Sequence, residues 1–151
     1  MTGPVFVDTN VFIYALDEAD PDKQRAARAW KAALWESRRG RTGYQVLEEF
    51  YSKITRKWPA ARDRARAEIR DLLTWRPVRV DAGTLEQAWN IQDRCHFSFW
   101  DALVVAAAKS ASCHYLLTED LQAGQDLGGI RIVNPFLGGP DSLSSKIANN
   151  R

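Results

Sequence analysis

Short apolar runs alternate along this chain with longer segments in which apolar residues recur every three or four positions. The runs are short and rich in β-branched residues, which favours buried strands; they cover residues 5–7, 78–80, 114–118 and 130–133. Gly40 and Gly43 interrupt the helical pattern, which leaves room for a further short strand at 41–42. The periodic segments predict helices over 11–16, 22–38, 45–58, 60–75, 84–95 and 100–111. Strands that alternate with helices predict a mainly parallel sheet covered by helices on both faces.

The first run ends abruptly in polar residues. Val5–Val7 is followed at once by Asp8, Thr9 and Asn10. In open α/β sheets, ligands and catalytic groups collect at the carboxyl ends of the strands, at the point where the strand order reverses. We therefore expect Asp8 to lie in a functional site, and we ask which other residues the fold would bring to it.

Three more acidic positions border apolar stretches of the chain. They are Glu48 or Glu49 in the 45–58 helix, Asp101 at the start of an alanine-rich helix, and Asp120 after the 114–118 strand. Helical periodicity does not choose between Glu48 and Glu49, since both fall off the apolar stripe. Asp101 alone could simply complement a helix dipole. Together, however, these acids predict a carboxylate cluster beside Asp8.

A carboxylate cluster needs a compensating cation, because neighbouring negative charges repel and raise one another's pKa. Mg²⁺ or Mn²⁺ suits such oxygen ligands. An ion held in this way can ionise a bound water and neutralise charge on a phosphate oxygen, which is the chemistry of phosphodiester hydrolysis. The two histidines lie at the ends of predicted helices without an evident catalytic nucleophile, so the sequence offers no competing histidine, serine or cysteine triad.

Four segments together resemble the motifs of the PIN domain family, in the form found in VapC-type toxins. They are VFVDTN at 5–10, QVLEEFY at 45–51, SFWDALVVAAA at 98–108 and LTEDLQAG at 117–124. The resemblance runs from Val5 to about Leu137. It implies a three-layer αβα sandwich with a mainly parallel sheet of four or five strands. It also implies a metal-dependent endoribonuclease, the toxin of a type II toxin-antitoxin pair.

The resemblance carries roles for individual residues. It implies that Asp8, Glu49, Asp101 and Asp120 are the catalytic, metal-binding acids, and that Thr9, Asn10 and Thr118 are their polar neighbours. The register of the motif selects Glu49 over Glu48. It further implies Mg²⁺ or Mn²⁺ as the cofactor, RNA as the substrate, an antitoxin as a partner, and a homodimer. One departure is Gly43, where such proteins often carry a hydroxyl residue; Thr42 either replaces it or the role is absent.

Length and composition predict one domain. The 151 residues are 45% hydrophobic, enough for a single core. We assign residues 1–137 to the nuclease domain and expect the Gly-, Pro-, Ser- and Asn-rich segment 138–151 to be a disordered tail. No apolar run approaches the ~20 residues that span a bilayer, and no signal peptide begins the chain. We therefore expect a cytoplasmic protein without membrane contact.

Charge is distributed unevenly. The net charge is +2, but residues 23–79 hold 16 Lys and Arg against 6 Asp and Glu, while the remainder holds 5 against 13. Such runs are often solvated helix faces. They also fit an acidic centre that binds cations beside a basic flank that attracts a polyanion. On that interpretation Arg56, Lys57, Arg62 and Arg66 contact the RNA backbone.

Six tryptophans are many for a small core. Trp30, Trp35 and Trp58 fall in helices that also carry basic residues, and aromatic side chains are enriched at interfaces. This observation again predicts a homodimer and a hydrophobic groove for an antitoxin segment. The pairs Cys95-His96 and Cys113-His114 match no familiar zinc spacing, so we expect reduced, packed cysteines.

Other phosphoryl-transfer folds fit less well. A phosphatase of the haloacid-dehalogenase type needs a second acid two residues after the first, where this chain has Asn10. A receiver domain pairs adjacent acids ahead of its phospho-acceptor, and neither class accounts for Glu49 and Asp101. A non-catalytic module that binds metal and RNA, or another protein, remains the alternative, because metal ligands do not prove turnover.

Overall fold

The computed structural model describes residues 3–143, which form strands and helices in alternation. The elements are β1 (Val5–Val7), α1 (Thr9–Tyr14), α2 (Pro21–Ser37), β2 (Gly40–Arg41), α3 (Tyr44–Lys57), η1 (Pro59–Ala61), α4 (Arg62–Leu72), η2 (Leu73–Trp75), α5 (Ala82–Cys95), α6 (Phe99–Ser110), β3 (Tyr115–Leu117) and β4 (Arg131–Val133). Every predicted helix is present within a few residues of its expected bounds. Among these residues, no helix is both long and apolar enough to cross a bilayer.

The strands form a four-stranded, fully parallel sheet in the order β2-β1-β3-β4. Val5 lies opposite Gly40 on one side and Tyr115 on the other. The chain moves outward from β1 in one direction to β2 and in the other to β3 and β4. The strand order therefore reverses beside β1, and Asp8 follows β1 at that reversal. This arrangement confirms the predicted α/β fold, and β1 is one of the two inner strands.

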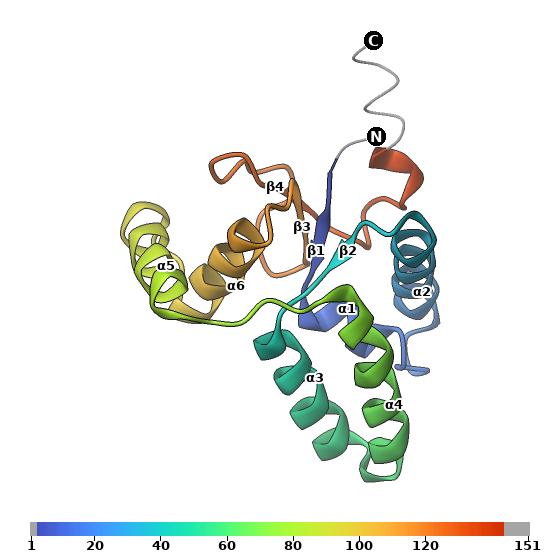
Figure 1. The fold of residues 1–151 in the computed structure, drawn as a ribbon. Coiled ribbons are helices and arrows are strands. Elements are labelled where there is room, and N and C mark those ends of the chain that lie inside the picture. The colour runs from blue at the N-terminus through green and yellow to red at the C-terminus, as the bar shows by residue number, and fades with distance from the viewer. Residues whose placement is uncertain (1–2, 144–151) are drawn as a thin grey trace.

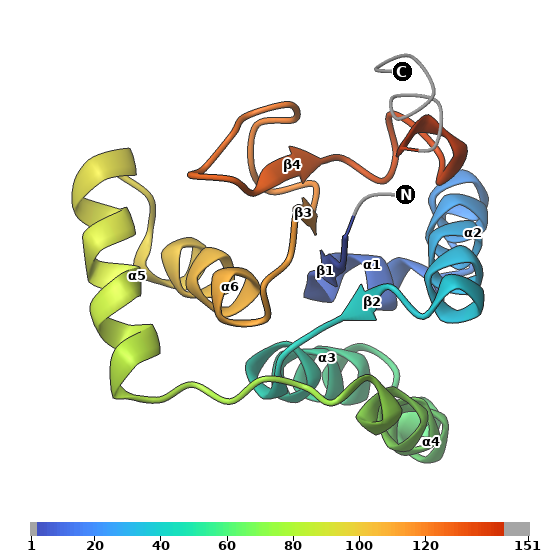
Figure 2. The same cartoon turned by 45° about the horizontal axis from the view of Figure 1, so that its top comes forward.

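Helices cover both faces of the sheet (Figures 1 and 2). α6 and, outside it, α5 lie on one face, while α1 and α2 lie on the other. α6 packs closely because it presents small apolar residues to the sheet, and all residues from Ala102 to Ala108 are buried. The hairpin of α3 and α4 extends past the carboxyl ends of β1 and β2. It therefore forms one wall of the space beyond the sheet edge.

Capping residues fix where several helices begin. Asp20 accepts a hydrogen bond from the Lys23 backbone N–H, and Pro21 occupies the first turn of α2. Ser98 accepts a hydrogen bond from the Asp101 N–H at the start of α6. Since α6 begins there, Asp101 is held in its first turn, at the same end of the sheet as Asp8.

The predicted strand at 78–80 is wrong. Val78 makes only an isolated bridge with Gly43: its N–H donates to the Thr42 carbonyl, and its own carbonyl accepts from Tyr44 N–H. The ladder cannot continue because Tyr44 already begins α3. The sheet consequently has four strands, the smaller of the two numbers predicted.

The tail predicted from residue 138 lies partly outside the described residues, which end at Leu143. The part that is described packs on the domain: Leu143 is only 2% exposed, and the Gly138 carbonyl accepts a hydrogen bond from Trp30 Nε1. Trp30 itself is 1% exposed, so it belongs to the core rather than to a surface groove. The division into a nuclease domain and a disordered tail stays a prediction.

Candidate active site

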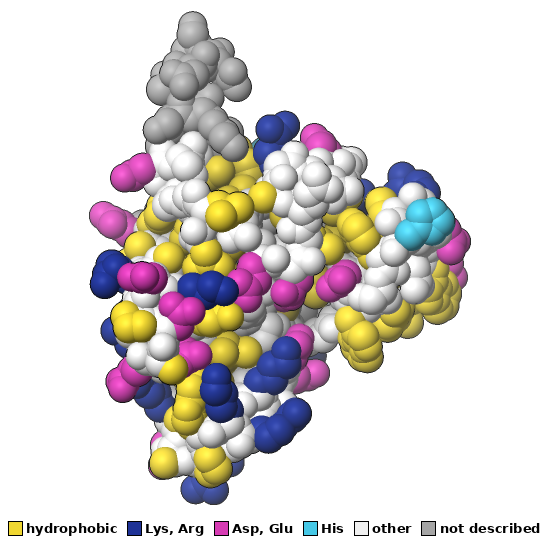
Figure 3. Space-filling model, turned by 180° about the vertical axis from the view of Figure 1, so that it is seen from behind, with side chains coloured by type: hydrophobic (Ala, Val, Ile, Leu, Met, Phe, Trp, Pro, Cys, Tyr) yellow, Lys and Arg dark blue, Asp and Glu magenta, His cyan; other side chains and the backbone are white. Residues whose placement is uncertain are grey.

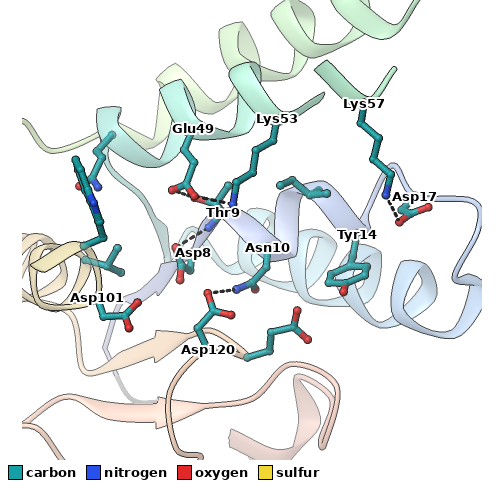
Figure 4. A pocket seen from close by; sticks show the side chains of 15 residues that line it. Asp8, Thr9, Asn10, Tyr14, Asp17, Glu49, Lys53, Lys57, Asp101 and Asp120 are labelled. Carbon is teal, nitrogen blue, oxygen red and sulfur yellow. Dashed lines mark hydrogen bonds and ion pairs between the residues drawn. The ribbon is translucent and has the colours of Figure 1, made fainter. Parts of the chain in front are cut away.

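All four predicted acids line one cavity of about 290 Å³ at the carboxyl end of the sheet (Figure 4). Asp8 follows β1, Glu49 comes from α3, Asp101 from α6, and Asp120 from the loop after β3. Four segments far apart in sequence thus contribute one carboxylate each. Glu48 is exposed and does not line this cavity, which we call the acid pocket.

Asp8 is the most deeply placed of these acids. It is 8% exposed, and its carboxylate accepts hydrogen bonds from Thr9 N–H at 2.7 Å and from the Thr118 hydroxyl at 2.8 Å. Burial raises the pKa of Asp8 to about 6, and the charges of Asp120 and Glu49 act in the same direction. The two hydrogen bonds oppose this rise. Asp8 therefore needs a positive partner to stay ionised at low cost.

Thr118 joins three of the site residues. Its fully buried hydroxyl donates to Asp8 and accepts from the Asn10 side-chain amide at 3.3 Å and from Asp120 N–H at 3.2 Å. The same Asn10 amide donates to an Asp120 carboxylate oxygen at 3.2 Å. The predicted polar neighbours thus hold Asp8 and Asp120 in fixed relation. Thr9 has the same function for Glu49, because its hydroxyl donates to that carboxylate at 3.1 Å.

Asp120 and Asp101 complete the electrostatic cluster. Burial raises the pKa of Asp120, and the charges of Glu119 and Asp101 raise it further, whereas the Asn10 hydrogen bond and the charge of Lys53 lower it. The charges of Glu49 and Asp120 raise the pKa of Asp8, and the charge of Asp101 raises the pKa of Asp120. The four carboxylates therefore act on one another as a chain across the pocket.

Basic side chains enter the pocket from α3. Gln45, Glu49, Lys53 and Lys57 all line it and recur every four residues, so they form one stripe along the helix. Lys53 pairs with Glu49 at 2.8 Å, and Lys57 pairs with Asp17 at 3.4 Å. Figure 3 shows acidic side chains gathered across the middle of one face of the molecule, with basic side chains over the α3–α4 end.

Comparison with known proteins decides the family. The family model of the PIN domain matches residues 5–124, most of the chain. The chain belongs to the PIN domain family. A comparison with curated proteins found no match.

Solved structures share this PIN fold. A toxin-antitoxin complex from Klebsiella pneumoniae aligns with a TM-score of 0.62 at 17% identity, over 87% of this chain and 97% of that chain. VapC20 of Mycobacterium tuberculosis, a sarcin-ricin loop cleaving toxin, aligns with a TM-score of 0.57 at 24% identity, over 74% and 86%. VapBC2 from Rickettsia felis, bound to a promoter DNA fragment, aligns with a TM-score of 0.57 at 12% identity, over 86% and 97%.

The donor chemistry of this PIN domain suits a hard divalent cation. The pocket offers carboxylate oxygens from four segments, and Asn10 adds a buried amide oxygen, Oδ1, that has no hydrogen-bond partner. Within residues 3–143, however, no three His, Cys, Asp or Glu side chains are placed to hold one ion together. Glu49 is instead engaged by Lys53 and Thr9. The residues fit Mg²⁺ or Mn²⁺ in kind, and their side chains would have to turn toward it.

The predicted cysteine and hydroxyl positions lie away from the pocket. Cys95 and Cys113 are both free thiols, and Cys113 is buried. The Thr42 hydroxyl donates to the Val7 carbonyl at 3.2 Å, so it stabilises the pairing of the first two strands. Gly43 caps α3 without a side-chain hydrogen bond. Thr42 therefore does not stand in for the missing hydroxyl at the helix start.

The predicted RNA-binding residues divide into two groups. Lys57 lines the acid pocket, and Arg56 lies beside it around a neighbouring hollow at the end of α3. Arg62 and Arg66 belong to α4 and do not line either hollow. Arg66 donates instead to the Tyr51 hydroxyl at 3.1 Å.

Sequence reasoning missed several residues that line the acid pocket, among them Lys53 and Trp100. Lys53 lies four residues after Glu49, so its helical spacing alone could have placed it on the same face. Trp100 precedes Asp101 within one of the four motifs, and nothing in the sequence marks it as exposed. Its exposure of 64% is visible only in the structure.

Proposed function

We propose that this PIN domain is a metal-dependent endoribonuclease, the toxin of a type II toxin-antitoxin pair. The observation that carries the proposal is the convergence of Asp8, Glu49, Asp101 and Asp120 in one pocket at the strand-order reversal. Mutual repulsion and the burial of Asp8 make this cluster costly without a cation. Four acids from separate segments stabilise nothing in the fold by repelling one another, whereas one divalent ion would compensate the charges of all four.

The acids, their polar neighbours and two lysines have different roles in this proposal. The four acids would hold Mg²⁺ or Mn²⁺, and Asn10 and Thr118 would keep Asp8 and Asp120 at a fixed separation. A bound ion would supply an ionised water and neutralise charge on the phosphate. Lys53 and Lys57 would attract the RNA backbone to the mouth of the pocket, because both project into it from α3.

Partners follow from the same proposal. Two of the structural neighbours are described as toxin-antitoxin or VapBC assemblies, which supports an antitoxin as the partner of this chain. Trp35 and Trp89 are 41% and 46% exposed, which leaves apolar surface for protein contacts. We extend the proposal to a homodimer on this basis.

The adjacent glutamates provide the sharpest test. Glu49→Gln removes a charge from the pocket, whereas Glu48→Gln makes the same change one position away on an exposed face. Cleavage of single-stranded RNA is measured for the wild type and both variants with Mg²⁺, with Mn²⁺ and with EDTA. We expect at least a hundredfold loss for Glu49→Gln, no change for Glu48→Gln, and no cleavage in EDTA.

The outcome separates the proposal from its alternative. Equal activity of all three proteins would contradict the role given to Glu49, and activity that survives EDTA would contradict metal dependence. Thermal melts with and without the ion complete the experiment. Stabilisation of the wild type by Mn²⁺ without cleavage of any RNA would favour a non-catalytic metal- and RNA-binding module.

A further inference from the structure

Trp100 is the most exposed of the six tryptophans, with 64% of its surface open to solvent. Large apolar side chains are exposed at a cost, and contiguous exposed apolar surface often marks a binding site. Trp100 lines the acid pocket beside Asp101. Its position combines a large aromatic surface with the carboxylates that the proposed function requires.

The indole is held in place by a rigid element. Trp100 is the second residue of α6, whose following turns are buried against the sheet. Its ring meets Phe99 edge to face, with centroids 5.4 Å apart and planes at 65°. Such a contact orients a ring without covering it. Trp100 is thus a preformed aromatic platform, and little conformational entropy is lost when a ligand stacks on it.

The pocket has an aromatic end and a cationic end. In Figure 4, Asp101 and Lys57 lie at opposite ends, with Asp8 and Asp120 between them. Trp100, next to Asp101 on α6, therefore lies at the end away from Lys57. A single strand of RNA offers both matching groups, because its unstacked bases bind aromatic rings and its phosphates bind ammonium groups.

We propose that Trp100 stacks on a nucleobase adjacent to the phosphate in the acid pocket, and that it thereby selects unpaired RNA. This inference rests on the proposed ribonuclease function and adds a substrate-positioning residue to it. A base inside a duplex is already stacked on both sides and cannot present its face to the ring. Paired RNA is consequently a poor ligand, whatever its sequence.

The test measures binding rather than cleavage, in the Glu49→Gln background. The probes are a labelled single-stranded RNA of about 12 nucleotides, the same RNA annealed to its complement, and a series with one abasic nucleotide at successive positions. Trp100→Ala, Trp100→Phe and Leu137→Ala are compared by fluorescence anisotropy. Leu137 is the control, since it is also a large, exposed apolar side chain but does not line the pocket.

We expect Trp100→Ala to weaken single-strand binding by about 5- to 150-fold, the range of one base stack. Trp100→Phe should retain most of the affinity, and Leu137→Ala should leave it unchanged. At one position of the RNA, an abasic nucleotide should weaken binding to the proteins that have Trp or Phe at position 100. The same abasic RNA should bind Trp100→Ala as tightly as the intact RNA does. That coupling identifies stacking, because a merely structural role of Trp100 would leave the abasic penalty intact.

Three results would overturn the inference: unchanged affinity in Trp100→Ala, an abasic penalty that survives it, or equal binding of duplex and single strand. A change of oligomeric state in Trp100→Ala by light scattering, with RNA affinity unchanged, would assign the ring to a protein interface. Cleavage by the wild type is assayed separately. If RNA binds through Trp100 but the wild type does not cleave it, the proposed ribonuclease function is contradicted and the stacking is not. If Trp100→Ala binds and cleaves RNA normally, the stacking is contradicted and the ribonuclease function is not.

Discussion

The Lys53 ammonium group lies 2.8 Å from the Glu49 carboxylate, one helical turn away on α3, and both side chains line the acid pocket. The protein therefore supplies a cation of its own to a carboxylate that the proposed function assigns to a metal. Both side chains are about half exposed, at 52% and 40%, so the pair itself contributes little to folding stability. Its effect should appear in cation binding.

Replacement of Lys53 by Met should strengthen Mn²⁺ binding. The change frees Glu49 and removes a positive charge near the ion, and we expect a gain of about 1 kcal/mol, roughly fivefold in affinity. Isothermal titration with Mn²⁺ measures it. Lys57→Met is the matched control, because Lys57 pairs with Asp17 rather than with Glu49. Weaker Mn²⁺ binding by Lys53→Met would show that Lys53 helps to organise the site.

Replacement of Asp8 by Asn should stabilise the metal-free protein at neutral pH. Burial raises the Asp8 pKa from 3.8 to about 6, so the fold loses up to about 3 kcal/mol of stability as pH rises from about 4 to 6, and this loss is complete at neutral pH. Below about pH 4 the group is protonated in both the folded and unfolded states, and the difference disappears. Urea unfolding of the wild type and Asp8→Asn in EDTA, at neutral pH and below about pH 4, measures the difference in their free energies of unfolding. Asp17→Asn, which removes a buried acid that already has a lysine partner, should not stabilise.

The raised Asp8 pKa also predicts how metal binding depends on pH. The ion binds the ionised carboxylate, so Mn²⁺ affinity should fall as pH drops through about 6. Thr118→Val should move this midpoint upward, because it removes a hydrogen bond that favours the charged form. It should also cost about 1–3 kcal/mol of stability by leaving buried polar groups unpaired. Thr118→Ser keeps the hydroxyl, and a Ser variant that behaved like Val would refute the hydrogen-bond explanation.

The two groups of predicted RNA-binding residues should differ in their salt dependence. Neutralising Arg56 and Lys57 together should lower the slope of log affinity against log salt by about 1.4, or two phosphate contacts on a single strand. Both residues lie by the pocket or at its neighbouring hollow. The Arg62 and Arg66 pair on α4 should change the slope less. Identical slopes in all variants would assign these charges to solvation or to antitoxin contacts.

The homodimer is a prediction that light scattering can check at micromolar concentration. Trp35 and Trp89 leave exposed apolar surface outside the acid pocket. We expect the mass of two chains for the wild type. A monomer at this concentration would remove the support that these tryptophans give to self-association, and a monomer that dimerises only with an antitoxin would place them at that interface.

The sequence alone determined the layout of this protein, because local rules suffice for it. The apolar run Val5–Val7 had to be a buried strand, and an acid directly after it had to lie at the sheet edge. Helical periodicity likewise located every helix to within a few residues. The order of four motifs then identified the family and singled out Glu49, which the structure places in the pocket while Glu48 stays exposed.

Tertiary structure decided what depends on contacts between distant segments. The strand predicted around Val78 does not form because the segment that pairs with it, at Gly43, becomes helical from Tyr44 onward. The length of this pairing is therefore set by a segment distant in sequence. Trp30 and Trp100 have the same side chain, yet one is 1% exposed and the other 64%, because burial depends on what packs against a helix face. The pKa of Asp8 depends in the same way on burial and on charges contributed by residues 49 and 120.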